Sequence, residues 1–236
     1  YYQGIAYHEL KQQSNAMMSF DKAISLDSSN ALFYNAKGLL LRDQRNYEKA
    51  IEQFELAADR KPEILNPIVN KAQALSLLNR NEEAIVIYNK MLQQYPGYIP
   101  AMIFKAESLK ELNRYEEALK VYDDAIAQEP NAADLVFNKG NIYANQNKME
   151  AALDCYNKAV KLDPQFPDAY YHIGLVNQRL GRYQDALTNF ERAIERESPT
   201  PMARIALADL HHQFGDETKA MQIMNDAVER YPNSPF

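Results

Sequence analysis

The sequence has few of the residues that turn or cross-link a chain. Its 236 residues include 7 glycines, 11 prolines, no tryptophan and one cysteine, Cys155. Scarce glycine and proline disfavour a turn-rich β fold and favour helices. One cysteine excludes a disulfide bond within the chain and fits a reducing compartment. No run of 18 apolar residues is present, so we expect no membrane insertion and an intracellular, cytoplasmic protein.

Dense clusters of positive charge are also missing. The chain carries 26 Lys and Arg against 32 Asp and Glu, which gives a net charge of −6. Because nucleic-acid binders usually present a basic stripe to the phosphates, we expect no nucleic-acid partner. The 16 tyrosines and 9 phenylalanines supply enough apolar surface for a folded core, which argues against a disordered chain.

Motifs that carry catalysis are missing as well. The sequence contains no G-x-x-x-x-G-K-S/T, G-x-G-x-x-G, G-x-S-x-G or H-E-x-x-H. His211 and His212 are adjacent, so on a helix they point in different directions, and no further His or Cys lies three or four residues away. Cys155 has no obvious His partner and is interpreted as a structural thiol. We therefore predict no enzyme, no catalytic residues, no metal and no cofactor.

What the sequence does contain is a period of 34 residues. Alanine recurs at Ala16, Ala50, Ala84, Ala118, Ala152, Ala186 and Ala220. Glycine or alanine recurs twelve residues earlier, at Gly4, Gly38, Ala72, Ala106, Gly140, Gly174 and Ala208. A large apolar side chain follows each alanine by four residues, at Phe20, Phe54, Tyr88, Tyr122, Tyr156, Phe190 and Met224. Such a fixed period is the signature of a repeat architecture.

The spacing within each period predicts a pair of helices. Ala50, Phe54 and Ala57 fall at i, i+4 and i+7, which places them on one face of a helix. Small residues at Gly38 and Ala50 allow the two helices of a pair to approach closely. One such hairpin cannot bury its own apolar face, whereas stacked neighbours form a continuous core. These columns specify a fold rather than a chemistry.

The columns resemble those of the tetratricopeptide repeat family over the whole chain, most closely at 134–164 and 168–199. The resemblance implies an all-α fold, an α-solenoid of antiparallel helix hairpins that forms a right-handed superhelix with a concave groove. We predict one array over 1–236, with a partial repeat at 1–30, full repeats at 31–64, 65–98, 99–132, 133–166, 167–200 and 201–234, and the start of another at 235–236. Neither end shows a polar cap, so we expect the native protein to continue beyond both.

The sequence departs from the family in two columns. The usual early aromatic is present as Tyr34 and Tyr170, but the same position holds other residues elsewhere, Ile68 among them. Lysine stands before the small residue, where the family more often has leucine, at Lys37, Lys71, Lys105 and Lys139. The fold does not depend on these positions, but their packing is not predicted by the resemblance.

The resemblance also implies that the first helix of each repeat lines the groove and binds a partner protein or peptide. The residues expected to face the groove are Asn35, Val69, Asn70, Gln73, Ile103, Phe104, Glu107, Phe137, Asn138, Asn141, Tyr171, His172 and Leu175. The apolar members are candidate anchors for a partner. The asparagines can hydrogen-bond the backbone of an extended peptide. An alternative is that Val69, Ile103 and Phe137 only pack against the neighbouring repeat.

The absence of catalytic motifs in an uninterrupted array favours a non-catalytic interaction scaffold, as part of a larger protein or assembly. The alternatives are a substrate-recognition arm of an enzyme, of the glycosyltransferase type, and a receptor for targeting signals. Family members that hold the C-terminal tails of chaperones need a clamp of lysine, asparagine and arginine. Asn141 fits one clamp position, but Phe137 and His172 occupy two others. A chaperone tail is therefore not the expected ligand.

Overall fold

The computed structural model describes residues 1–232 and residue 234, and within this range it is entirely helical, with fourteen α-helices and no strand. The all-α prediction is confirmed, and fourteen helices fit about seven two-helix repeats. Residues 235–236, where the sequence predicts the start of a further repeat, lie outside the described residues. Within the described range, no helix is both long enough and apolar enough to cross a membrane. The repeat boundaries stay a prediction.

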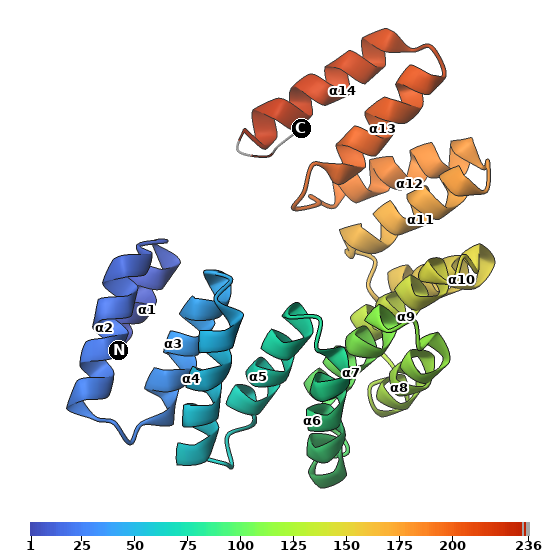
Figure 1. Cartoon of the computed structure of the whole chain (residues 1–236). Helices are drawn as coiled ribbons and strands as arrows, with labels where there is room; N and C mark the ends of the chain where they lie inside the picture. The colour runs from blue at the N-terminus through green and yellow to red at the C-terminus, as the bar shows by residue number, and fades with distance from the viewer. Residues whose placement is uncertain (233, 235–236) are drawn as a thin grey trace. The chain divides into compact units, whose positions relative to one another are not determined.

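First and second helices of the hairpins alternate along the chain. The first helices are α1 (Tyr2–Glu9), α3 (Ala31–Asp43), α5 (Leu65–Leu77), α7 (Ile99–Glu111), α9 (Ala133–Asn145), α11 (Pro167–Arg179) and α13 (Met202–Gln213). The second helices are α2 (Gln13–Leu26), α4 (Tyr47–Arg60), α6 (Asn81–Gln94), α8 (Tyr115–Gln128), α10 (Met149–Leu162), α12 (Tyr183–Glu195) and α14 (Glu217–Arg230). Consecutive antiparallel pairs follow one another in Figure 1.

The helices group into two compact units, residues 1–121 and 122–236, with the boundary inside α8. In the first unit, which we call unit 1, α5 contacts α4 and α6 and also touches the first helices on either side, α3 and α7. In the second, unit 2, α11 contacts α10 and α12 and touches α13. First helices therefore lie beside first helices within each unit, so the side chains that they share form one face.

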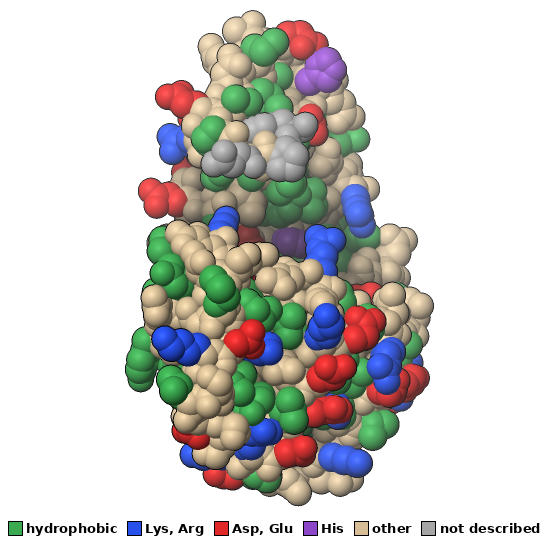
Figure 2. Space-filling model, turned by 60° about the vertical axis from the view of Figure 1, so that its left-hand side comes forward, with side chains coloured by type: hydrophobic (Ala, Val, Ile, Leu, Met, Phe, Trp, Pro, Cys, Tyr) green, Lys and Arg blue, Asp and Glu red, His purple; other side chains and the backbone are tan. Residues whose placement is uncertain are grey.

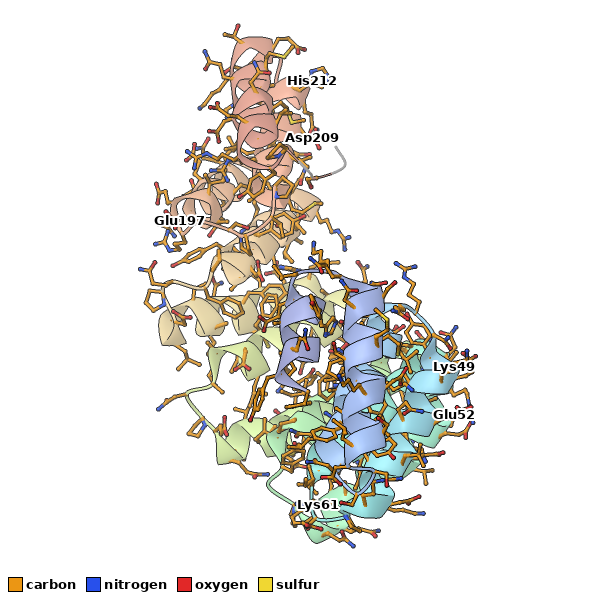
Figure 3. All side chains as sticks on the ribbon, turned by 90° about the vertical axis from the view of Figure 1, so that its left-hand side faces the viewer. Lys49, Glu52, Lys61, Glu197, Asp209 and His212 are labelled. Carbon is orange, nitrogen blue, oxygen red and sulfur yellow. The ribbon has the colours of Figure 1, made fainter. Side chains whose placement is uncertain are left out.

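The alanine and glycine columns are explained by close helix packing. Ala50, Phe54 and Ala57 are completely buried on one side of α4. A methyl group at Gly38 would lie 2.5 Å from the Phe54 ring, so only glycine leaves room for that ring. The opposite side of α4 is polar, and there Lys49 and Glu52 point away from the neighbouring helices (Figure 3). The predicted amphipathic hairpin is thus observed.

The turn between the two helices of each hairpin has its own 34-residue period. One residue with a left-handed backbone ends each first helix, at Lys11, Arg45, Asn79, Asn113, Asn147, Gly181 and Gly215. In the turn after α3, the Asn46 amide bonds to the Leu41 carbonyl at 2.9 Å and the Arg45 amide to the Arg42 carbonyl at 2.9 Å. These bonds satisfy carbonyls that the helix end leaves open. The backbone conformation recurs although the side chain does not.

The lysine column, where the sequence departs from the family that it resembles, forms ion pairs between hairpins. Lys37 lies 2.7 Å from Asp21, and Lys71 lies 2.7 Å from Glu55. In unit 2, Lys139 pairs with Asp123. Each of these three lysines meets an acid sixteen residues earlier, on the preceding second helix. The column therefore links a first helix to the hairpin before it.

Candidate functional site

The first-helix face of unit 1 brings together six of the predicted groove residues: Asn35 on α3, Asn70 and Gln73 on α5, and Ile103, Phe104 and Glu107 on α7. All six are half-buried. The Asn70 amide donates a hydrogen bond of 2.9 Å to the Asn35 side-chain oxygen. The Gln73 oxygen accepts one of 3.3 Å from Arg42. Some polar side chains of this face therefore form hydrogen bonds between neighbouring first helices.

A cavity of about 730 Å³ opens on this face, and three of the predicted residues, Gln73, Phe104 and Glu107, line it. Leu77 and the ring of Phe104 supply apolar wall, and Arg42 and Glu111 supply charge at the rim. The Ser76 and Ser108 hydroxyls lie 2.9 Å apart at the junction of α5 and α7. The walls combine apolar and polar groups, as is usual in sites that bind a specific ligand.

Two buried polar atoms of α6 lack partners in this cavity. The Tyr88 hydroxyl and the Asn81 side-chain oxygen form no hydrogen bond, although Tyr88 is completely buried and Asn81 is 6% exposed. Burial raises the pKa of Tyr88 far above its usual value, so the phenol stays protonated and able to donate. A buried polar group without a partner is costly, so both atoms favour a ligand that can bond to them.

In unit 2 the predicted residues form an aromatic cluster around His172. The His172 ring lies edge-on to Phe137 at 4.9 Å and to Tyr171 at 5.3 Å between centroids. Its Nδ1 lies 2.8 Å from the Asp168 carbonyl oxygen, one helical turn earlier. Burial lowers the pKa of His172 below its ordinary value, so the ring is neutral at pH 7. This cluster offers ring edges and faces rather than charge.

The other predicted residues of unit 2 differ in the contacts that their side chains make within the chain. The Asn141 oxygen accepts a hydrogen bond of 2.8 Å from the Tyr156 hydroxyl, so it is occupied within the chain. Leu175 packs against a core cluster that contains Phe190. Asn138 is half-buried. Of the two predicted groove asparagines on α9, Asn141 is thus the one whose oxygen has a partner within the chain.

Two predicted groove residues are buried. Val69 is 4% exposed and packs with Tyr88 and Met91, and Phe137 is 9% exposed and packs on Phe166 at 4.9 Å. The alternative stated from the sequence, core packing, therefore describes these two residues, and neither offers much surface to a partner. Ile103, for which the same alternative was open, is half-buried.

Sequence reasoning missed Tyr88 and Asn81 because both lie on a second helix. A signal for Tyr88 was available in the spacing of the repeats. Tyr156 bonds to Asn141, fifteen residues earlier, and the residue fifteen before Tyr88 is Gln73. Gln73 bonds to Arg42 instead. The spacing thus gives Tyr156 and Tyr88 a candidate partner each, but only the tertiary contacts show that the candidate partner of Tyr88 bonds to Arg42.

The electrostatic character of the surface is mixed. Figure 2 shows Lys, Arg, Asp and Glu side chains interspersed over the visible face, without a region of one sign. Over residues 1–232 and 234, no group of three or more His, Cys, Asp or Glu side chains is arranged to hold a metal ion. Burial raises the pKa of Cys155, which keeps this thiol protonated at neutral pH. A protonated thiol is a poor nucleophile.

Comparison with protein families gives consistent matches along the chain. A family model described as tetratricopeptide repeat matches residues 1–63 and 171–235, which together make up more than half of the chain. A second model with the same description matches residues 77–125, and one described as TPR repeat matches 106–147 and 140–181.

Three individual proteins are similar to this chain. The uncharacterized protein ycf37 of Cyanophora paradoxa is 34% identical over 90 residues, which are 36% of this chain and 52% of that protein; the chain thus spans about half of this relative's length. A solved tetratricopeptide repeat protein from Parabacteroides merdae superposes with a TM-score of 0.73 at 14% identity, over 96% of this chain and 90% of that one. YrrB, described as a TPR protein with an unusual peptide-binding site, gives 0.51 at 21% identity, over 78% and 95%. The two structural similarities show the fold alone.

Proposed function

Because this chain belongs to the tetratricopeptide repeat family, we propose that it is a non-catalytic scaffold that holds a segment of a partner protein against its first-helix face, within a larger protein or assembly. The observation that carries this proposal is the cavity between α3, α5 and α7. It is large enough for several side chains, and the Tyr88 hydroxyl and Asn81 oxygen in it lack partners.

The chemistry of the cavity suits a polypeptide. A peptide unit offers both a donor and an acceptor, so it can satisfy the Asn81 oxygen and the Tyr88 hydroxyl, respectively. Apolar side chains of the partner would pack on Phe104 and Leu77, which line the same cavity. Burial of such anchors provides most of the affinity in protein interfaces. The partner segment would therefore be extended or helical, with at least one apolar side chain.

The charges on the face support a protein partner over a nucleic acid. Arg42, Glu107 and Glu111 at the cavity carry both signs, and the chain as a whole has a net charge of −6. YrrB, with its unusual peptide-binding site, is a precedent for this class of ligand on the same fold. The single cysteine supports a cytoplasmic location for the complex.

Of the two alternative functions, a recognition arm of an enzyme and a receptor for targeting signals, the first was suggested by the asparagine series. Asn70 already bonds to Asn35, and Asn141 already accepts from Tyr156. Asparagine side chains that already form hydrogen bonds within the chain are less available to a ligand. These contacts therefore favour the scaffold over a function that depends on free asparagines.

The proposal is tested with peptides selected from a random-sequence display library against the purified chain. Binding of a labelled selected peptide is measured by fluorescence anisotropy for the wild type and for Phe104→Ala, which removes the apolar wall. We expect about tenfold weaker binding for this variant, equivalent to roughly 1.4 kcal/mol. The matched control is Val86→Ala, a truncation of an exposed side chain on α6 that does not line the cavity. Equal affinities of Phe104→Ala and the wild type would contradict the proposal.

A further inference from the structure

An arginine stacked on a tyrosine closes the outer side of one hairpin. The Arg60 guanidinium carbon lies 3.9 Å from the centre of the Tyr34 ring. Arg60 Nε donates a hydrogen bond of 2.6 Å to the carbonyl of Ser28, at the end of the preceding hairpin. The Tyr34 hydroxyl donates to the same carbonyl at 3.2 Å. Ring and guanidinium together fill the junction between two second helices.

The same arrangement recurs in unit 2, four periods later. The Arg196 guanidinium carbon lies 4.3 Å from the centre of the Tyr170 ring, and its Nε donates to the Pro164 carbonyl at 2.7 Å. Pro164 is the counterpart of Ser28 in the 34-residue frame. In both units, a guanidinium that stacks on a ring and bonds to the preceding carbonyl thus closes the junction.

The last hairpin also places a guanidinium at the equivalent junction, but this arginine lies on the first helix of its hairpin, α13. Arg204 takes the position of Tyr34, and its side chain is 6% exposed. Its Nε lies 2.6 Å from the Asp226 carboxylate. The Tyr231 hydroxyl donates 2.7 Å to the carbonyl of Ser198, the counterpart of Ser28. Three junctions of this chain are therefore filled by arginine from the chain itself.

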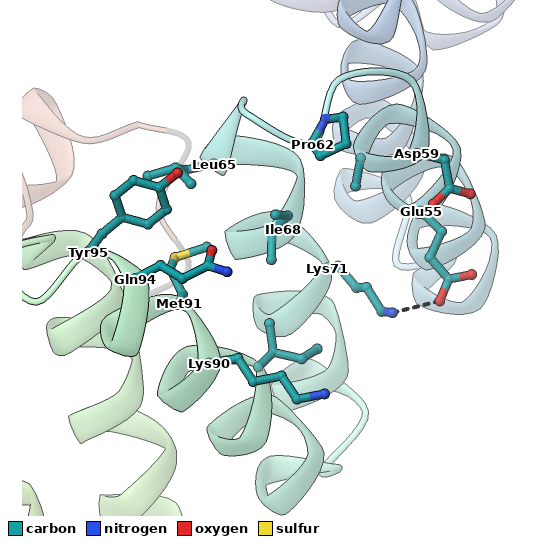
Figure 4. Close-up of a pocket in the computed structure, with 12 residues that line it drawn as sticks. Glu55, Asp59, Pro62, Leu65, Ile68, Lys71, Lys90, Met91, Gln94 and Tyr95 are labelled. Carbon is teal, nitrogen blue, oxygen red and sulfur yellow. Dashed lines mark ion pairs between the residues drawn. The ribbon is translucent and has the colours of Figure 1, made fainter.

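The junction between α4 and α6 lacks both groups and is hollow. Ile68 replaces the tyrosine and Gln94 replaces the arginine. Both side chains, with Pro62 at the position of Ser28, line a cavity of about 320 Å³ between α4, α5 and α6 (Figure 4). Among the described residues, none donates a hydrogen bond to the Pro62 carbonyl. The hollow thus keeps open the acceptor that arginine or tyrosine satisfies at Ser28, Pro164 and Ser198.

The charges of the hollow leave one acidic group available. Glu55 is paired with Lys71 at 2.7 Å. Asp59, exposed on the same helix, forms no ion pair within the described residues. Lys90 also lines the hollow, at the opposite end from Pro62 in Figure 4. The Pro62 end therefore combines a carbonyl acceptor with an unpaired carboxylate.

The remaining walls suit the rest of an arginine side chain. Leu65, Ile68 and Met91 provide an apolar surface for its methylene groups. Tyr95 lines the hollow and is the counterpart of Tyr231, whose ring lies 5.7 Å from the Arg204 guanidinium. A planar guanidinium presents a rigid fork of donors that can bond to two oxygens at once, whereas a lysine ammonium acts as a point charge.

We propose that this hollow is a second binding site, which receives an arginine side chain of a partner polypeptide. The arginine takes the place that Arg60 and Arg196 occupy in their own hairpins. Its guanidinium bonds to the Pro62 carbonyl and the Asp59 carboxylate, which lie on the same side of the hollow, while Tyr95 forms the wall at the other side (Figure 4). The hollow lies between α4, α5 and α6, and none of its lining residues lines the cavity on the first-helix face. The two sites are therefore separate.

The site is tested by NMR titration of the ¹⁵N-labelled chain with N-acetyl-arginine amide at constant ionic strength. N-acetyl-lysine amide and N-acetyl-phenylalanine amide serve as comparison probes of the same length of backbone. We expect the arginine probe to shift the amides around Ile68, Met91 and Gln94 in a saturable manner, with at least about fivefold weaker binding of the other two. Absence of these shifts, or equal binding of either comparison probe, would overturn the proposal.

Two variants of the chain make the test specific. The double variant Ile68→Tyr/Gln94→Arg builds the internal pair seen at Tyr34 and Arg60, so it should raise the thermal unfolding midpoint and abolish the probe's shifts. Asp59→Asn alters one exposed side chain and should weaken the probe several-fold without loss of folding. Val228→Ala, a truncation of an exposed side chain on α14 in unit 2, should leave the titration unchanged. Undiminished binding to Asp59→Asn and to a folded double variant would refute an arginine site here.

Discussion

The hydroxyl of Tyr156 donates a hydrogen bond of 2.8 Å to the side-chain oxygen of Asn141. Tyr88 stands at the same place in an earlier repeat, but its counterpart partner, Gln73, accepts from Arg42 at 3.3 Å. The Tyr88 hydroxyl is therefore buried without a partner. Equivalent tyrosines of two hairpins thus differ in whether their hydroxyl has a partner, and the unpartnered one belongs to the candidate site.

This pair predicts opposite effects of the same substitution. Tyr156→Phe removes a hydrogen bond and should lower the free energy of unfolding by about 1 kcal/mol. Tyr88→Phe removes an unsatisfied hydroxyl, so stability should be unchanged or higher by up to about 1 kcal/mol. Urea unfolding followed by circular dichroism measures both. An equal loss for the two variants would show that Tyr88 has a partner in the folded chain.

The contact between the glycine and aromatic columns predicts a steric effect. A methyl group at Gly174 would lie 2.4 Å from the Phe190 ring. Gly174→Ala should therefore cost about 1–3 kcal/mol, because the core must shift to admit it. The double variant Gly174→Ala/Phe190→Leu should cost less than the sum of the two single changes. Strictly additive costs in denaturant unfolding would mean that the two residues do not compete for space.

The left-handed turn residue predicts a stabilising change. Arg45 is exposed and adopts a φ of 60°, which is unfavourable for a residue with a Cβ. Arg45→Gly should raise the free energy of unfolding by about 1 kcal/mol, after the greater freedom of glycine in the unfolded chain is included. The reciprocal control is Gly181→Arg, at the same turn position with a φ of 73°, which should destabilise. A melting point lowered by Arg45→Gly would contradict this explanation of the turn.

The buried histidine predicts a dependence of stability on pH. Burial lowers the pKa of His172 in the folded chain, whereas its value in the unfolded chain is about 6.5. As the pH falls below that value, the unfolded chain binds the proton first, so the free energy of unfolding decreases. Stability at pH 5.5 should be lower than at pH 7.5, and part of the loss, roughly 1 kcal/mol, should disappear in His172→Gln. The same pH dependence in variant and wild type would assign the loss to other groups.

The hairpins could be predicted from the sequence because their core positions tolerate few residue types. Gly38, Ala50 and Phe54 fit against one another, so each constrains the others and the 34-residue period is visible. The turn was missed because only its backbone conformation recurs, with lysine, arginine, asparagine or glycine at the position. The lysine column was seen as a departure, but its acidic partners lie on another helix and in another repeat.

The candidate site was predictable to a smaller extent. The resemblance to the family placed Gln73, Phe104 and Glu107 on the first-helix face, and all three line the cavity. It did not separate them from Val69, because a position on the same helix face becomes buried when its neighbours are large. Nor could it find Tyr88, since an unpartnered hydroxyl depends on which of two neighbours Gln73 bonds to. Such choices are set by tertiary contacts.

The affinity of a display-selected peptide for Tyr88→Phe tests the central claim most directly, because this variant should fold as well as the wild type and differ by one buried hydroxyl. If a partner polypeptide occupies the cavity on the first-helix face, its dissociation constant should rise about three- to tenfold, roughly 0.7–1.4 kcal/mol. A dissociation constant equal to that of the wild type would contradict the assignment of this cavity as the binding site.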